Sequence, residues 1–235
     1  MEKSDQKILK PGLYLVPTPI GNLDDITLRG LKVLNAADII ACEDTRHTGN
    51  LIKLFNITEK KLLSYHDYNE DSRAEELIDH IKNGKIVALV SDAGTPVISD
   101  PGYRVVSKAI KNGIDVIALP GPSAFLPALT ASGLETHNFT FFGFPPQKKG
   151  RMTFLEMVAN HNFTSILYES SHRIDKLITE LDKHCGGDRK ICIAREISKL
   201  HEEYIRGTIA ECRLVIQNRP NLKGEFVVII ESKKD

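Results

Sequence analysis

Residues that could bind a polar ligand are concentrated between Ser91 and Gly102, in the stretch SDAGTPVISDPG. The stretch holds two aspartates, two serines and a threonine, and its glycines let a ligand approach the backbone closely. Backbone amides and a few side-chain oxygens of this kind suit a medium-sized polar ligand. Read alone, the stretch is compatible with a phosphate, a sugar or a cofactor as its ligand.

A buried strand must position this loop. The apolar run Ile86–Val90 leads into it, and a helical pattern from Tyr103 to Asn112 leaves it. Asp100 is predicted as the N-cap of that helix and Pro101 as its first residue. Ligands of open α/β sheets bind beyond the carboxyl ends of the strands. We therefore expect Asp92 to contact a ligand at such an edge, and Asp100 to cap the helix.

The rest of the first half repeats this order of apolar strand, polar loop and helix. Continuous apolar strands that alternate with helices predict a parallel sheet covered on both faces. The polar loops then converge on one edge of that sheet. Ser72 is predicted to cap a helix over residues 73–83, with Glu75 at its third position. The five strands are expected near residues 12–16, 38–42, 62–65, 86–90 and 116–119, with further helical segments at residues 26–36 and 51–55.

The second half has a different pattern, beginning with an aromatic strand at residues 139–144. Strands outnumber crossover helices there, which predicts a mixed sheet in a separate, smaller domain. We place the domains at residues 1–121 and 122–235. Thr208 is predicted to cap a helix over residues 209–217. The further strands are expected at residues 165–168, 191–194, 203–207 and 226–231, and the further helices at 152–159 and 175–184.

Composition narrows the class of protein. The chain has 31 lysines and arginines against 31 aspartates and glutamates, so no global positive field indicates nucleic-acid binding. The polar N-terminus lacks the apolar core of a signal peptide, and the apolar runs are too short to span a membrane. The four cysteines form no C-x-x-C pair, which predicts buried free thiols in a reduced, cytoplasmic protein.

Several common catalytic motifs are absent. The sequence has no G-x-G-x-x-G after the first strand, no P-loop and no G-x-S-x-G elbow. It also has no H-E-x-x-H and no cluster of cysteines and histidines, so we expect no metal. These absences exclude conventional dinucleotide-binding, P-loop and serine-hydrolase sites.

Five segments, in chain order, resemble the tetrapyrrole-methylase superfamily. They are most similar to its ribosomal RNA branch, the 16S rRNA (cytidine-2'-O)-methyltransferases. The resemblance runs from about Gly12 to Ile230. The segments are residues 15–23 (LVPTPIGNL), 41–46 (ACEDTR), 90–102 (VSDAGTPVISDPG), 119–124 (LPGPSA) and 142–145 (FGFP).

The resemblance implies a two-domain class III methyltransferase fold, usually a homodimer, with S-adenosylmethionine bound in the interdomain cleft. It implies as methyl acceptor the ribose 2'-hydroxyl of a cytidine in the decoding region, in 16S rRNA or the assembled small subunit. The positions that match the family's cofactor-binding residues are Asp92, Gly94, Thr95, Ile98, Ser99, Ser123, Ala124, Phe144, Pro145, Tyr168, Glu169, Ala194, Arg195, Gly224 and Glu225.

A ribose hydroxyl is a poor nucleophile, so a base or a cation that stabilises an alkoxide would help. Glu43, Asp44 and Arg46 after the second strand are the candidates for this catalytic role. The alternative is an ion-pair cluster that only holds the loop in shape. The candidates for RNA phosphate contact are Lys148, Lys149, Arg151, His172 and Arg173, with solvated charges or helix capping as the alternative.

Two other functions stay open at this stage. A small-molecule methylase of the tetrapyrrole type is the first, although that branch carries a glycine-rich first loop where this chain has Pro17–Asn22. A non-catalytic, RNA-binding α/β module is the second. Binding of S-adenosylmethionine would distinguish the enzymes from the module.

Overall fold

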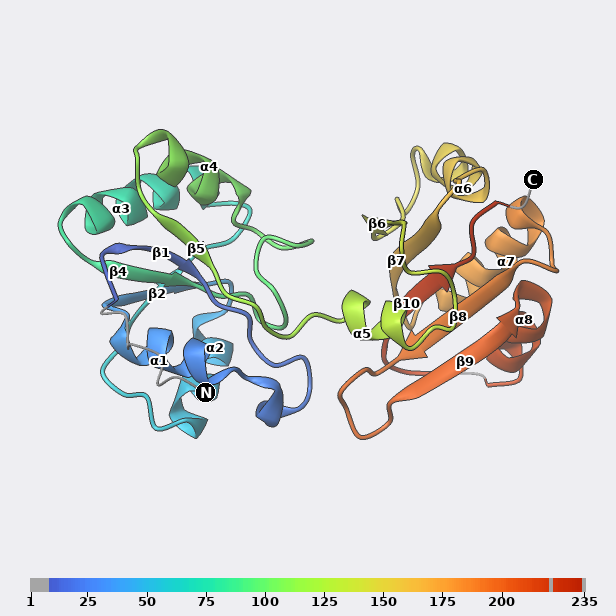
Figure 1. The fold of residues 1–235 in the computed structure, drawn as a ribbon, viewed down its shortest axis with the longest axis horizontal. Helices are drawn as coiled ribbons and strands as arrows, with labels where there is room; N and C mark the ends of the chain where they lie inside the picture. The colour runs from blue at the N-terminus through green and yellow to red at the C-terminus, as the bar shows by residue number, and fades with distance from the viewer. Residues whose placement is uncertain (1–8, 220–221, 234–235) are drawn as a thin grey trace. The chain divides into compact units, whose positions relative to one another are not determined.

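The computed structural model describes residues 9–219 and 222–233, and it divides into two compact units (Figure 1). The first unit is Met1–Ser123 and the second is Ala124–Asp235. This division lies two residues beyond the boundary expected from the sequence. Each unit is built around its own five-stranded sheet.

The sheet of the first unit is parallel throughout, with the strand order β3-β2-β4-β1-β5. This confirms the parallel α/β sheet that the continuous apolar strands predict. Strand β1 lies between β4 and β5, so the loops that follow these three strands are neighbours at one edge. The strands are β1 (Gly12–Leu15), β2 (Ile39–Cys42), β3 (Lys61–Ser64), β4 (Ile86–Leu89) and β5 (Val116–Ala118).

Helices cover both faces of this sheet (Figure 1). Side chains of successive strand residues point to opposite faces, so Tyr14 joins one core and Leu13 the other. Helices α1 and α2 pack on the first face, and α3 and α4 on the second. The helices are α1 (Leu28–Ala36), α2 (Thr45–Leu54), α3 (Glu70–Lys82) and α4 (Tyr103–Lys111), with a short 3-10 helix at Leu23–Asp25.

The sheet of the second unit is mixed, as expected, with the order β6-β7-β10-β8-β9. Only β6 and β7 pair in parallel, and the other pairs are antiparallel. Helices α6 (Arg151–Ala159), α7 (Ile174–Cys185) and α8 (Ile209–Gln217) share one apolar core with it. The strands are β6 (Phe139–Gly143), β7 (Thr164–Ser170), β8 (Lys190–Arg195), β9 (Glu203–Thr208) and β10 (Glu225–Ile230).

The sequence patterns do not predict one helix of the structure, and they predict another as shorter than it is. The missed helix is α5 (Phe125–Thr130), which has only six residues, contains Pro127 and has no side-chain cap. Helix α2 begins at Thr45, directly after Asp44, whereas the apolar pattern predicts a helical piece only from Leu51.

The starts of three helices test the capping predictions. Thr208 caps α8 as predicted, because the Glu211 N–H donates to its hydroxyl at 3.3 Å. The prediction for Ser72 is wrong: α3 begins at Glu70, and the Ser72 hydroxyl donates to the Asn69 carbonyl inside the first turn. The prediction for Asp100 is also wrong, since the residue that precedes α4 is Gly102, at φ 140°.

Two expectations from composition concern the core and the membrane. All four cysteines are free thiols, and three of them, Cys42, Cys192 and Cys212, are buried, as predicted. Within residues 9–219 and 222–233, no helix has both the length and the apolar character needed to cross a bilayer.

Gly102 is the glycine on which the end of the ligand loop depends. A Cβ there would lie 2.7 Å from Val97 Cγ2 and 3.0 Å from Leu89 Cδ2. We expect Gly102→Ala to lower the free energy of unfolding by about 2–4 kcal/mol, from the unfavourable φ and the overpacking together. Urea titration followed by circular dichroism measures this.

Gly84→Ala is the matched control, because Gly84 also has a positive φ, of 80°, but nothing lies within 4 Å of its Cβ position. We expect it to cost about 1–2 kcal/mol. Equal losses in the two variants would show that the packing around Gly102 adds nothing.

Candidate functional site

The loop Ser91–Gly102, hereafter the ligand loop, is fixed to both neighbouring loops of the first unit. Thr18 and Gly94 exchange two backbone hydrogen bonds of 2.9 Å, which join the ligand loop to the loop after β1. The buried Thr18 hydroxyl also donates to the Ser91 carbonyl at 3.1 Å. Beyond β1, the Thr95 hydroxyl donates at 2.8 Å to the carbonyl of Pro122, in the loop after β5. The three loops therefore form one connected edge.

The ligand loop keeps an unfavourable backbone conformation at two non-glycine residues. Val97 has φ 76° and Ser99 has φ 63°. A positive φ is a genuine outlier for a β-branched residue, and such conformations persist only where the surroundings enforce them, often at functional sites. Between these two residues lies the predicted cofactor contact Ile98, whose large apolar side chain is 42% exposed.

Carboxylates from three loops converge beside the ligand loop. Burial, followed by the nearby Glu43, raises the pKa of Asp100 to about 6, with Asp92 and Asp67 adding to the effect. Burial also raises the pKa of Glu43, followed by the charges of Asp92 and Asp67, while His66 lowers it. We call Glu43, Asp67, Asp92 and Asp100 the carboxylate group. In the described residues, no set of three or more His, Cys, Asp or Glu could hold a metal ion.

The three catalytic candidates after β2 have different surroundings. Glu43 belongs to the carboxylate group, whereas Asp44 is the N-cap of α2 and accepts from the Arg46 N–H at 2.7 Å. This hydrogen bond lowers the pKa of Asp44. The Asp44 N–H in turn donates to Asp92 Oδ1 at 3.2 Å. The Arg46 guanidinium is largely exposed and lies 3.5 Å from Asp44. Asp44 therefore stabilises the loop after β2 through its hydrogen bonds, whereas Glu43 belongs to the carboxylate group and has no such structural contact in the described residues.

Glu70 is a site residue that the sequence patterns missed. Its Oε1 accepts from the Tyr65 hydroxyl at 2.9 Å and from the Gly102 N–H at 2.8 Å. Its Oε2 lies 3.2 Å from Arg104 Nε. Glu70 thus joins the loop after β3 to the end of the ligand loop. No motif surrounds it, and its only signal in the sequence is an acidic residue before a helical pattern.

The predicted cofactor residues of the second unit lie around an aromatic group. The exposed Phe144 ring packs edge-on to Tyr168, with centroids 5.5 Å apart, and Phe141 meets Tyr168 at 5.0 Å. Strand register places Tyr168 and Ala194 on either side of Val227. Pro145 is buried directly after Phe144. These residues form an apolar, partly aromatic surface, which suits a flat ring such as adenine.

The polar members of the set make contacts within the second unit. The Glu169 carboxylate is buried and accepts from Arg173 Nε at 2.8 Å. Arg195 Nε donates to the Lys223 carbonyl at 2.7 Å. Glu225 is mostly exposed, with Lys199 2.9 Å away. Glu169 is therefore engaged with Arg173 through Oε1, whereas its buried Oε2 has no hydrogen-bond partner among the described residues.

Four positions complete the set. Ser99 has the strained φ already described, and Ser123 and Ala124 follow Pro122, to which Thr95 donates. Gly224 has φ 126°, and a Cβ there would lie 2.7 Å from Glu196 Cγ, so this position needs glycine.

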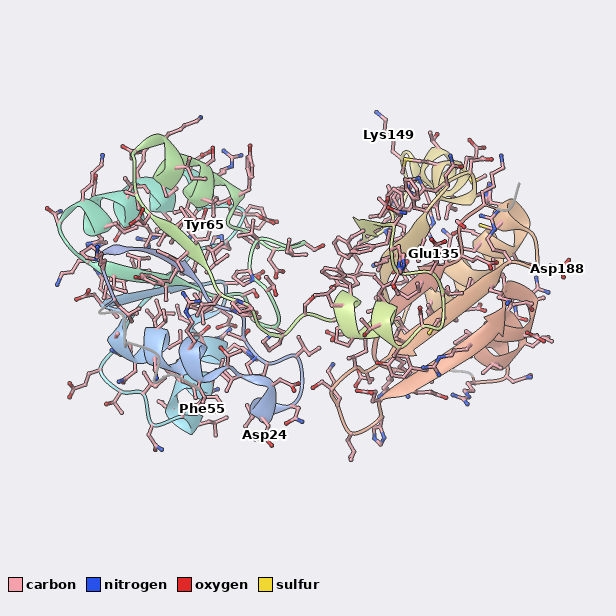
Figure 2. All side chains as sticks on the ribbon, in the orientation of Figure 1. Asp24, Phe55, Tyr65, Glu135, Lys149 and Asp188 are labelled. Atoms are coloured by element: carbon pink, nitrogen blue, oxygen red, sulfur yellow. The ribbon has the colours of Figure 1, made fainter. Side chains whose placement is uncertain are left out.

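The residues predicted to contact RNA are not equivalent. Lys148 and Lys149 are exposed before α6, where Figure 2 shows Lys149 pointing outward, and His172 is exposed before α7. Arg151 is only 4% exposed, because its guanidinium pairs with Glu180 at 2.6 Å and donates to the Pro146 carbonyl. A guanidinium buried in this way does not reach a phosphate, so the expectation for Arg151 does not fit the structure.

Comparison with known proteins finds a matching family and relatives that share much of this chain's sequence. Residues 12–213 match the family described as Tetrapyrrole (Corrin/Porphyrin) Methylases. A protein of Hydrogenobaculum sp. is 46% identical, over 94% of this chain and 96% of its own. A protein of Vibrio cholerae is 46% identical, over 96% of this chain and 78% of its own length. A protein of Halalkalibacterium halodurans is 47% identical, over 94% of this chain and 76% of its own length. All three are named "Ribosomal RNA small subunit methyltransferase I".

Two solved structures are similar in fold. A cobalt precorrin-4 methyltransferase has a TM-score of 0.67 and 20% identity, covering 93% of this chain and 94% of its own. A uroporphyrin-III-C-methyltransferase from Thermus thermophilus has a TM-score of 0.65 and 19% identity, with the same coverage. At these identities the likeness shows a shared fold alone.

The carboxylate group predicts an unusual dependence of stability on pH. The pKa of Asp100 is about 6 in the folded chain, above its ordinary 3.8, so folding disfavours the ionised carboxylate. The cost to stability is small near pH 4, where the unfolded carboxyl begins to ionise, and it is complete above the folded pKa. We expect Asp100→Asn to raise the free energy of unfolding by roughly 1–3 kcal/mol near pH 8 and to have little effect near pH 4.

Asp44→Asn is the control, and its effect on the free energy of unfolding should have the opposite sign, because hydrogen bonds lower the pKa of Asp44 in the folded chain. This variant should lose stability at neutral pH, and the loss should fade as the pH falls through the lowered pKa. Urea titrations at several pH values measure both variants. The same sign for both would contradict this description of the edge.

Proposed function

This chain belongs to the tetrapyrrole (corrin/porphyrin) methylase family, and from that premise we propose that it methylates ribosomal RNA of the small subunit. More finely, we propose that it transfers a methyl group from S-adenosylmethionine to the ribose 2'-hydroxyl of a cytidine in the decoding region of 16S rRNA. The observation that supports an RNA substrate is the similarity of nearly all of this chain to relatives named as ribosomal RNA methyltransferases.

The residues present fit a cationic cofactor. When bound, S-adenosylmethionine supplies a methyl group on a positively charged sulfonium. The ligand loop offers oxygens and no basic side chain, and Asp92 and Asp100 keep the local potential negative. A nearby positive charge is favoured by such carboxylates. In the second unit, the Phe144 and Tyr168 rings offer an apolar surface for the adenine. The full set of predicted cofactor contacts is proposed on this basis.

The chain itself has to align the acceptor hydroxyl and take up its proton. Alignment of reactants accounts for much of the rate when the donor is already activated. We propose Glu43 as the proton acceptor, because its raised pKa lies closer to neutrality than that of an ordinary glutamate. Asp44 holds the start of α2, and the exposed Arg46 is available to stabilise a developing alkoxide.

The remaining parts of the proposal concern partners and location. Lys148, Lys149 and His172 are proposed RNA contacts because they are exposed, and Arg173 is the weaker candidate because it pairs with Glu169. A homodimer and a cytoplasmic location are also proposed, and light scattering of the purified protein tests the first.

Labelling tests the proposed function. The protein is incubated with tritiated S-adenosylmethionine and, in parallel, with hypomethylated small subunits, naked 16S rRNA and a porphyrinoid precursor. We expect label in the RNA, recovered as 2'-O-methylcytidine in an alkali-resistant dinucleotide, because the blocked hydroxyl cannot assist cleavage. Label in the porphyrinoid and none in RNA would favour the small-molecule methylase. No binding of S-adenosylmethionine by calorimetry would exclude both enzymes.

Glu43→Gln belongs in the same experiment. We expect it to lower the rate of labelling by about 10²-fold or more, since a general base contributes on that order. Glu75→Gln is the matched control, because Glu75 lies on the surface of α3 with Lys108 3.0 Å away.

A further inference from the structure

Two tyrosines of the first unit are exposed at the edge that carries the ligand loop. The chain has six tyrosines, and Tyr68 and Tyr103, at 99% and 73% exposure, are the two that stand in solvent. The Tyr68 ring meets His66 edge-on, with centroids 6.0 Å apart. Tyrosine carries a large apolar body, and burying such a ring stabilises a complex. Exposed rings of this kind therefore mark a surface suited to a flat, apolar partner.

Glu70 holds the segments of both tyrosines together. Tyr68 lies two residues before Glu70, and Tyr103 lies between Gly102 and Arg104, whose N–H groups both donate to Glu70 Oε1. Tyr103 is also the first residue of α4, and side chains in a helix lean toward its N-terminus. That end of α4 is the end that meets the ligand loop. The segments that carry the two rings are therefore tied to the same carboxylate, and we call Tyr68 and Tyr103 the tyrosine pair.

The charges beside the tyrosine pair select its partner. Tyr68 follows Asp67 directly, and Asp100 lies three residues before Tyr103. Both carboxyls belong to the carboxylate group, which repels phosphate. An uncharged aromatic ring suits this surface better than a backbone phosphate does. A nucleobase is such a ring, and proteins commonly recognise single-stranded RNA by stacking its unpaired bases on aromatic side chains.

We infer that Tyr68 and Tyr103 form a stacking platform for nucleobases of single-stranded RNA next to the acceptor ribose. The inference rests on the proposed function and adds to it the way in which the acceptor strand is held. Stacking of bases on this pair would hold the acceptor strand at the edge of the sheet that also carries Glu43 and Asp92. It also assigns base contact to the first unit, apart from the lysines proposed for phosphate in the second.

Binding of a fluorescein-labelled, cytidine-containing single-stranded RNA of roughly ten nucleotides tests the inference by anisotropy. We expect Tyr68→Ala and Tyr103→Ala each to weaken binding by about 5- to 150-fold, the range for loss of one stacked base. Tyr68→Phe and Tyr103→Phe should bind within about twofold of wild type, because the ring and not the hydroxyl makes the contact. Ile110→Ala, at the other end of α4, is the control for loss of an exposed apolar side chain.

Two further readouts separate stacking from other roles. The alanine variants should keep the salt dependence of binding, because stacking releases no counterions, whereas Lys149→Gln should reduce it. They should also raise the KM for RNA while the Kd for S-adenosylmethionine stays unchanged, which excludes a general loss of structure.

The outcomes distinguish the inference from the proposed function. Wild-type protein that binds no oligonucleotide, alanine variants that bind as well as wild type, or phenylalanine variants that lose as much as alanine would each overturn the inference. If the wild type methylates RNA in any of these cases, the proposed function stands. If the wild type binds the oligonucleotide through the tyrosine pair but labels no RNA, the proposed function fails and the stacking platform stands.

Discussion

The pairing of Thr18 with Gly94 is the interaction on which the candidate site depends. Its two backbone hydrogen bonds fix the ligand loop against the loop after β1, at the strand between β4 and β5. The far end of the loop is fixed by Glu70, which accepts the Gly102 N–H. A loop held at both ends can keep Val97 and Ser99 at positive φ, because the anchors compensate for the local strain. The oxygens of Asp92 and Asp100 are consequently presented from a rigid support.

The chain keeps a group of like charges that lowers its stability. Burial, together with the neighbouring carboxylates, raises the pKa values of Glu43 and Asp100, and no lysine or arginine lies within the ligand loop to relieve them. Several buried or half-buried charges elsewhere in the described residues are paired, as Arg151 is with Glu180 and Glu169 with Arg173. An unpaired group at one edge is a feature that function explains better than folding does, because a site tuned for a cation costs stability when it is empty.

Sequence patterns predict the features that depend on neighbouring residues in the chain. They fail where a partner far away in the sequence determines what a side chain contacts. The apolar runs predict both sheets, and Thr208 is correctly predicted as the cap of α8, where the structure adds Glu211 as the second member of a capping box. Arg151 looked like a surface cation because its partner, Glu180, is 29 residues away. Glu70 looked uninformative for the same reason, since it binds Gly102 across 32 residues. Asp100 resembled an N-cap, but the turn at Gly102 moves it into the carboxylate group.

Hydrogen–deuterium exchange of the wild-type protein with and without S-adenosylmethionine tests the central claim that the ligand loop binds the cofactor. We expect slower exchange in peptides that cover residues 91–102, and no change in the peptide of α8, whose residues take no part in the proposed site. If saturating cofactor leaves the exchange of residues 91–102 unchanged while it protects another segment of the first unit, the ligand loop does not bind the cofactor.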